Sequence, residues 1–263
     1  MIFNSNILIL RVEILILEML KLGGNMKHKV LSIIKGTSHS NDFNNKHKLA
    51  FTLAEVLITL GVIGVVASIT MPTVIKEYQK HITVSKLKKA YTNLQNAIQM
   101  SISENGDMST WDFSENNDYS GTESKEFFDK YIVKYYKKLK NYHVYNSEVR
   151  SIDGLNPVKP EWITLTDGTS IGVTIKGRNS MWIYIDINEQ KLPNKLGKDV
   201  FLIAVLPKEN SLKFYGQGLT NERLVNPENI YSCNKNTNQP DAGGLCGAKI
   251  LQDGWKISDD YPW

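Results

Sequence analysis

Four side chains that carry oxygen lie close together in the sequence, just after an alternating apolar stretch. They are Asp186, Asn188, Asn194 and Asp199. Carboxylate and amide oxygens are the ligands that Ca²⁺ prefers, so this group offers a candidate calcium site. Gln190 and Lys191 depart from the helix-loop-helix calcium pattern, and Lys195 and Lys198 add positive charge beside any cation. We therefore expect a polar turn between two strands, with calcium as the alternative.

The histidines give little support for catalysis. His28, His39 and His47 lie in the first 50 residues, and only His81 and His143 follow them. Neither lies in a nucleophile or metal motif, and the glycines form no P-loop or dinucleotide-binding fingerprint. We therefore expect a protein that is not an enzyme and that carries no cofactor.

A single carboxylate, that of Glu55, lies in the longest apolar run of the chain. The run extends from Phe51 to Ile75 and reads FTLAEVLITLGVIGVVASITMPTVI. As a helix it rises about 37 Å at about 1.5 Å per residue, enough to span a hydrocarbon core of about 30 Å. Lys46, His47 and Lys48 precede the run. The positive-inside rule then places the N-terminal flank in the cytoplasm and the rest of the chain outside.

Glu55 needs an explanation, because a charge in the hydrocarbon core costs on the order of 2.5 to 3.5 kcal/mol on insertion scales. Thr52 and Glu55 have the spacing of a capping box, which places a negative group where the helix macrodipole favours it. Alternatively, cleavage just before Phe51 creates a positive amine one helical turn from Glu55. The carboxylate would then pair with this amine or with the amine of a neighbouring subunit.

The residues at this position resemble the cleavage and methylation signal of type IV prepilins and type II secretion pseudopilins. Residues 48–55, KLAFTLAE, place a small residue before an aromatic residue that is followed by Thr-Leu-x-Glu. Ala50 stands where the family most often has glycine. The resemblance implies that a prepilin peptidase and N-methyltransferase cuts between Ala50 and Phe51 and then methylates Phe51. Pro72 matches a proline that such helices carry near the end of their apolar segment, where it removes one backbone hydrogen bond.

The resemblance also implies a function. The chain would be a structural subunit of a type IV pilus or a type II secretion pseudopilus, with Thr52, Glu55 and Pro72 as assembly residues. Its partners would be other pilin or pseudopilin subunits and an assembly platform in the bacterial inner membrane, and it would end in a periplasmic or cell-surface filament. The alternative is a single-span anchored protein whose exported domain binds a ligand without forming filaments.

The charge of the chain is concentrated in residues 1–50, which have the composition of a cytoplasmic leader. They hold seven Lys or Arg and three Asp or Glu, a difference that equals the whole net charge of +4. Residues 51–263 are therefore formally neutral, and their charge does not indicate nucleic-acid binding. Gly23-Gly24-Asn25 back-translates to a sequence that resembles a ribosome-binding site, which makes Met26 the expected initiator.

Two cysteines, Cys233 and Cys246, lie on the expected exported side, where oxidation is favoured. A disulfide between them would close a loop of about 14 residues and stabilise the fold by roughly 3 kcal/mol in the chain-entropy model. Two free buried thiols are the alternative. Pilin-like proteins often close a variable C-terminal loop with a disulfide, and this segment occupies the matching place.

Hydrophobic periodicity predicts an α+β protein. Apolar residues at three- and four-residue steps continue the first helix from Thr52 to about Glu104. The lysines on its other face are expected to be solvated: Lys76, Lys80, Lys86, Lys88 and Lys89. Residues 107–123 are expected to be irregular, and a second amphipathic helix is expected at 124–141. The domains are then the leader at 1–50, the long helix at 51–105 with a transmembrane first half, and an exported globular domain at 106–263.

From residue 161 the pattern changes to a period of two, which is typical of strands. Strands are predicted at 162–165 and 169–175 on either side of the turn Asp167-Gly168, and at 181–187 and 200–206. A further strand at 212–215 is less strongly patterned. We expect an antiparallel sheet of about four strands that packs one face on the long helix, an arrangement that the resemblance makes pilin-like.

Overall fold

The computed structural model describes residues 52–113, 117–118, 122–136, 139–144, 149–150, 157–158, 160–176, 181–189, 191, 193–237 and 242–263. The chain forms two units, residues 1–75 and residues 76–263. The predicted leader, Met26, and the predicted cleavage position between Ala50 and Phe51 lie outside the described residues.

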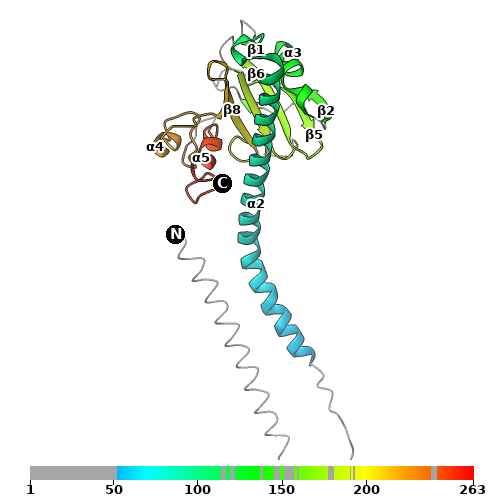
Figure 1. Ribbon diagram of the computed structural model, residues 1–263. Helices are drawn as coiled ribbons and strands as arrows, with labels where there is room; N and C mark the ends of the chain where they lie inside the picture. Colours follow the sequence, from blue (N-terminus) through cyan, green and yellow to red (C-terminus); the bar gives the residue numbers. More distant parts are fainter. Residues whose placement is uncertain are drawn as a thin grey trace, which may run out of the picture. The chain divides into compact units, whose positions relative to one another are not determined.

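The longest element is a single helix, α2 (Leu53–Asn105), which contributes residues to both units (Figure 1). It ends at Gly106, whose φ of 79° is the left-handed conformation that commonly terminates helices. The Gly106 N–H donates to the Ile102 carbonyl at 2.9 Å and so satisfies one of the last carbonyls of the helix. The predicted helix from Thr52 to about Glu104 is therefore confirmed to within one residue at each end.

The described part of the first unit is the apolar half of α2. Its large side chains are exposed, among them Leu53 at 77%, Ile63 at 63% and Val74 at 66%. By length and composition α2 can cross a bilayer, and none of its most apolar 18-residue window is buried. The hydroxyls in this half donate to carbonyls of the same helix: Thr59 to Val56, Ser68 to Val65 and Thr70 to Val66. No hydroxyl among these three therefore needs water.

The second unit is built on an antiparallel sheet. Five strands follow one another in sequence and in space, which is the commonest way to connect such a sheet. They are β5 (Glu161–Leu165), β6 (Ser170–Lys176), β7 (Met181–Asp186), β8 (Val200–Leu206) and β9 (Ser211–Phe214). The four predicted strands and the more weakly patterned fifth are therefore confirmed. A short pair, β3 (Val149–Arg150) and β4 (Pro157–Val158), lies outside this sheet.

Two sequence predictions next to the sheet are wrong. The second helix, α3 (Thr122–Tyr131), ends ten residues before the predicted end at 141. A 3₁₀ turn, η2 (Val133–Tyr135), follows it, and residues 139–144 form β2 (Leu139–Val144), which pairs with β5. Residues 107–123 are not wholly irregular, since they include the 3₁₀ turn η1 (Met108–Thr110) and β1 (Asn117–Asp118) beside β6. In both places the strand is selected by a partner far away in the sequence, which local periodicity does not report.

One face of the sheet packs on α2. Cross-strand partners share a face, and Val173, Ile183, Ile203 and Phe214 lie in one such row. Tyr91 of α2 stacks on Phe214 with ring centroids 4.5 Å apart, and its hydroxyl donates to the Leu212 carbonyl at 3.2 Å. Figure 1 shows this part of α2 lying along the strands. The predicted packing of the long helix on the sheet is confirmed.

The lysines of α2 follow the prediction only in part. Lys76, Lys86, Lys88 and Lys89 are exposed as expected, but Lys80 is buried and forms an ion pair with Glu77 at 2.7 Å. A carboxylate one turn away supplies the partner that a buried lysine requires. The solvated-face prediction is therefore wrong at Lys80.

Candidate functional site

The first candidate site is the start of α2, where the only carboxylate of the apolar run lies. The Thr52 N–H and the Thr52 hydroxyl both donate to Glu55 Oε2, at 2.9 and 3.0 Å. In return, the Glu55 N–H donates to Thr52 Oγ1 at 3.3 Å. These are the reciprocal bonds of a capping box. The capping explanation of Glu55 is therefore confirmed, while the amine that cleavage would create at Phe51 lies outside the described residues.

The chemistry of this site is that of a stabilised charge. The two Thr52 groups are neutral donors, so these two hydrogen bonds stabilise the Glu55 carboxylate without adding a positive charge. The positive end of the helix macrodipole acts in the same direction.

Pro72 lies inside α2. Because proline has no N–H, the Ser68 carbonyl lacks its usual helical partner four residues ahead. The boundary between the two units, at Ile75, follows three residues later. The structure thus places Pro72 inside α2, at a point where one backbone hydrogen bond of the helix is missing.

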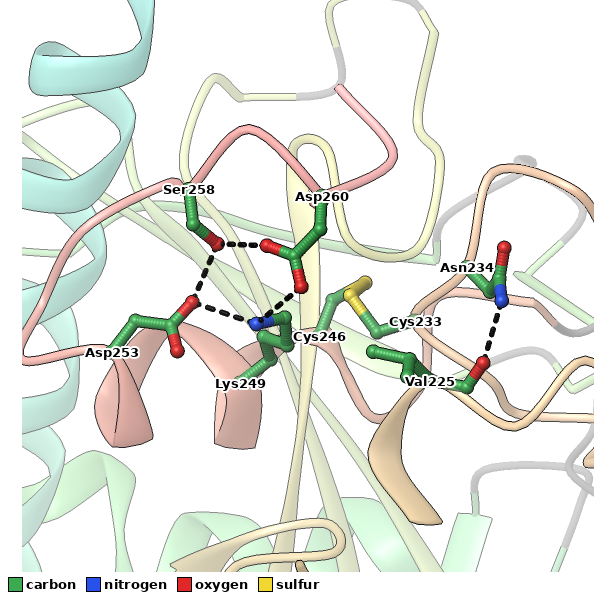
Figure 2. Close-up of polar contacts among 8 residues, drawn as sticks. All are labelled: Val225, Cys233, Asn234, Cys246, Lys249, Asp253, Ser258 and Asp260. Carbon is green, nitrogen blue, oxygen red and sulfur yellow. Dashed lines mark hydrogen bonds and ion pairs between the residues drawn. A yellow bond between two sulfur atoms is a disulfide. The ribbon is translucent and has the colours of Figure 1, made fainter. Parts of the chain in front are cut away.

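A second candidate site is the C-terminal lobe, by which we mean the described residues from 215 to 263. Cys233 and Cys246 are joined there by a disulfide with Cα atoms 4.8 Å apart (Figure 2). The bond connects the segment after α4 (Asn221–Leu224) to the first residue of α5 (Cys246–Gln252), and both cysteines are fully buried. The predicted disulfide is confirmed, and the free-thiol alternative is wrong.

The same lobe buries a lysine between two carboxylates. Lys249 is 2% exposed, and its Nζ lies 2.9 Å from Asp253 Oδ2 and 3.0 Å from Asp260 Oδ2. Figure 2 shows the Ser258 hydroxyl between the two carboxylates, 2.6 Å from an oxygen of each. We call these four residues the Lys249 cluster.

The ionisation of the Lys249 cluster follows from these contacts. Burial by itself lowers the pKa of Lys249, but the hydrogen bonds and charges of Asp253 and Asp260 outweigh it and raise the pKa above its usual value. The Ser258 hydrogen bond, assisted by Lys249, lowers the pKa of Asp260. The Lys249 amine is therefore held as an ammonium, which is not nucleophilic. The cluster thus stabilises the fold of the lobe and is not a reactive centre.

Two further side chains near the C-terminus, Tyr261 and Trp255, contact the rest of the domain. The Tyr261 hydroxyl donates to the Gly197 carbonyl, and complete burial of this side chain raises its pKa well above the usual value. Trp255 packs against both Tyr91 and Phe214, with centroids 6.1 and 6.0 Å away, and Lys88 Nζ lies 5.6 Å from the centre of its ring. The lobe is thereby attached both to α2 and to the loop after β7.

The four candidate calcium ligands do come together, but as a hydrogen-bonded turn. Asp199 accepts bonds from Asn188 Nδ2 at 3.1 Å and from the N–H groups of Asn194 and Lys195 at 2.9 and 2.5 Å. Asp186 and Asp199 are both buried, and Asp186 Oδ1 accepts the Asn188 N–H at 2.8 Å. Of the side-chain oxygens of these four residues, only Asn188 Oδ1 is a buried acceptor without a hydrogen-bond partner. One free acceptor is far from the six to eight oxygens that Ca²⁺ takes.

Sequence reasoning missed the Lys249 cluster. The spacing of Lys249 and Asp253 by four residues, one helical turn apart, was the available signal. Among the described residues no group of three or more His, Cys, Asp or Glu side chains gathers that could hold a metal ion. His81 is exposed on α2, and the side chain of His143 lies outside the described part of the chain.

Comparison with protein families gives one match. The profile of a family described as a family of unknown function (DUF6613) matches residues 73–263. The match begins immediately after Pro72, so it covers the second unit and leaves out residues 1–72, which include all but the last three residues of the apolar run. Comparison with curated proteins and with solved structures gave no match.

Proposed function

This chain belongs to the DUF6613 family, and because that family has no assigned function, we propose one from the residues of the chain itself. In this proposal the chain is a prepilin-type structural subunit, which is cut between Ala50 and Phe51 and is anchored in the bacterial inner membrane by the first half of α2. Its C-terminal domain is exported, and it assembles through α2 into a type IV pilus or a type II secretion pseudopilus. The observation that carries this proposal is the motif at residues 48–55, which leads directly into an exposed apolar helix.

The two halves of α2 support this use because they differ in what covers them. In the second half Leu87, Leu94 and Ile98 are at most 1% exposed, because the sheet covers them. In the first half the apolar residues have no cover among the described residues. Fully burying one such side chain is worth about 1.5 to 3 kcal/mol, so this surface will be covered by lipid or by other apolar helices. A subunit that moves from membrane to filament exchanges one cover for the other.

Glu55 would set the position at which neighbouring subunits pack against one another. In a bundle of apolar helices a buried carboxylate without a positive partner is strongly unfavourable. Thr52 supplies only neutral donors. The amine of a cleaved Phe51 on a neighbouring subunit would supply the positive charge, and subunits would then stack where the two groups meet.

The C-terminal lobe agrees with an exported domain. Disulfides form and persist in oxidising compartments and are rare in the cytosol. The bond between Cys233 and Cys246 therefore favours the orientation that the basic N-terminal flank predicts.

The decisive experiment is mass spectrometry of the mature N-terminus, on protein taken from membranes and from sheared surface material. N-methylated Phe51 is expected in both samples. A variant with Ala50→Glu should keep its leader, because a bulky charged residue replaces a small one at the cut, and this variant serves as the unprocessed control. An intact leader on the wild-type protein would refute processing.

A single-span anchored binding protein is the second candidate. It is favoured by one observation, namely that the family match begins at residue 73 and does not include the prepilin-like segment. The same measurement separates the two candidates, because an unfilamented anchor would keep its leader and would be absent from sheared material.

A further inference from the structure

The loop after β7 carries three exposed lysines. We call the described residues 187–189, 191 and 193–199 the basic loop, and its exposed lysines are Lys191, Lys195 and Lys198. None of the three pairs with a carboxylate among the described residues. A set of free lysines on one short loop is an electrostatic surface without a partner inside the domain.

The basic loop lies at the end of the sheet that α2 reaches first along the chain. Asp186 pairs with Ser170, so the end of β7 lies beside the turn between β5 and β6. Lys86 Nζ donates to the Ile187 carbonyl at 3.2 Å, and Lys89 pairs with Asp167 at 2.8 Å. Lys86 follows Ile75 by eleven positions, which is a rise of about 16 Å along a helix. The loop is therefore hydrogen-bonded to a residue of α2 that follows shortly after the apolar run in the sequence.

The basic loop is also held in one shape. Asp199 ties together Asn188, Asn194 and Lys195, as described above. Gly197 has a φ of 79°, and a Cβ added to it would lie 2.7 Å from Cys246 Sγ, so the loop packs directly on the disulfide. Hydrogen bonds to the buried Asp199 thus fix the conformation of the loop, while its lysine side chains remain exposed.

Carboxylates equal the lysines in number at this loop, but they are less exposed, so positive charge is what the loop presents to solvent. Asp186 and Asp199 are buried, and the neutral backbone donors of Asp199 leave its negative charge in place, while Asp167 is paired with Lys89. Glu189, and Asp259 near Tyr261, are the acids that reduce this positive charge.

We propose that the basic loop binds the phosphate groups of anionic lipids at the surface of the membrane that α2 crosses. This inference rests on the anchoring part of the proposed function. Lysines near an anionic surface are attracted to it within about one Debye length, roughly 10 Å at 0.1 M salt. Each such lysine strengthens binding about five-fold. The contact would hold the exported domain near the bilayer until assembly removes the subunit from it.

The test uses the full chain, reconstituted into vesicles of phosphatidylcholine alone or of phosphatidylcholine mixed with phosphatidylglycerol. Flotation first measures insertion, which should be equal in the two lipids. Acetylation of lysines is then followed by mass spectrometry. Labelling of Lys195 and Lys198 should slow about five-fold with the anionic lipid, and about 1 M salt, where the Debye length is about 3 Å, should abolish the difference. Lys208 and Lys235, exposed elsewhere on the same domain, should label equally in both vesicles.

Two variants with the same change in charge complete the test. K195E/K198E should remove the effect of anionic lipid on labelling of Lys191, whereas K208E/K235E should leave it unchanged. Equal labelling in both lipids after normal insertion would overturn the lipid contact and leave the anchoring intact. Failure to float with either vesicle would overturn both. Protection that occurs in neutral vesicles and disappears on dilution would assign the loop to a second copy of the chain and overturn the lipid contact.

Discussion

The Lys249 cluster allows a prediction in which removing charge from different members has unequal effects. Lys249 is 2% exposed, whereas the side chains of Asp253 and Asp260 are 22% and 53% exposed. Removing both carboxylates with D253N/D260N leaves a buried ammonium without a counter-charge. Removing the ammonium with K249M leaves two carboxylates that water can reach. The first change should therefore cost much more stability than the second.

The magnitudes follow from the burial of each group. Breaking a buried ion pair from one side costs about 3 to 5 kcal/mol, and the exposure of the carboxylates favours the lower value for D253N/D260N. K249M loses two partly exposed hydrogen bonds but gains apolar packing, a net cost of about 1 kcal/mol. For a domain of this size 1 kcal/mol corresponds to about 2 to 4 °C in Tm. The expected decreases are therefore about 6 to 12 °C and about 2 to 4 °C.

The assay is thermal unfolding of the oxidised full chain in detergent, followed by tryptophan fluorescence, which reports on Trp255 beside the lobe. S258A is a matched control, since it removes the hydroxyl of the cluster and keeps all charges. It should lie between the wild type and D253N/D260N. If K249M lowered Tm more than D253N/D260N, the assignment of Lys249 as the group that depends on its partners would be refuted.

The remaining predictions concern pH, assembly, the disulfide and calcium. Because the pKa of Asp260 is lowered in the folded state, its stabilisation is complete above the ordinary value of 3.8 and is lost as pH falls through the folded pKa, so D260N should reduce the loss of Tm in acid. Glu55→Ala should leave cleavage intact and abolish incorporation into filaments, whereas the control Glu104→Ala on the same helix should leave both cleavage and incorporation intact. Normal filaments from Glu55→Ala would contradict the assembly role. C233S/C246S should lower stability by about 3 kcal/mol in chemical unfolding, and an unchanged midpoint would contradict this. Excess calcium or chelator should leave Tm unchanged, because Asp199 is already occupied by N–H donors, and a calcium-dependent rise would revive the metal site.

Most of the fold could be predicted because its elements have strong local patterns. The apolar steps from Ile75 to Ile102 specify a helix whatever it packs on, and the alternation from residue 161 specifies strands. Strand β2 could not be predicted, because Leu139–Val144 becomes a strand only by pairing with β5, more than fifteen residues away. Its local sequence continues the helical spacing of Phe127, Phe128 and Tyr131 and so favours the wrong structure.

The candidate sites divide in the same way. The capping box is a local device, so the spacing of Thr52 and Glu55 was sufficient to predict it. The oxygens at Asp186 and Asp199 were visible in the sequence, but the N–H donors that occupy Asp199 depend on how the turn closes, and composition does not report them. Only the pair of Lys249 and Asp253, four residues apart on a helix, could be predicted from the sequence. The contact of Asp260 with Lys249 depends on how the chain folds back after α5, which the sequence pattern does not report.

The starting point of the family match bears on how the proposed function should be tested. The match begins at residue 73, so membership of the family is defined by the second unit, while the prepilin-like motif lies wholly in the part that the match leaves out. Evidence about processing therefore has to come from residues 48–55, and evidence about partners from the second unit. The basic loop belongs to the family domain, and it is hydrogen-bonded to Lys86, eleven positions after Ile75 in α2. A lysine surface that responds to anionic lipid would show that the domain is shaped for the membrane as well as attached to it.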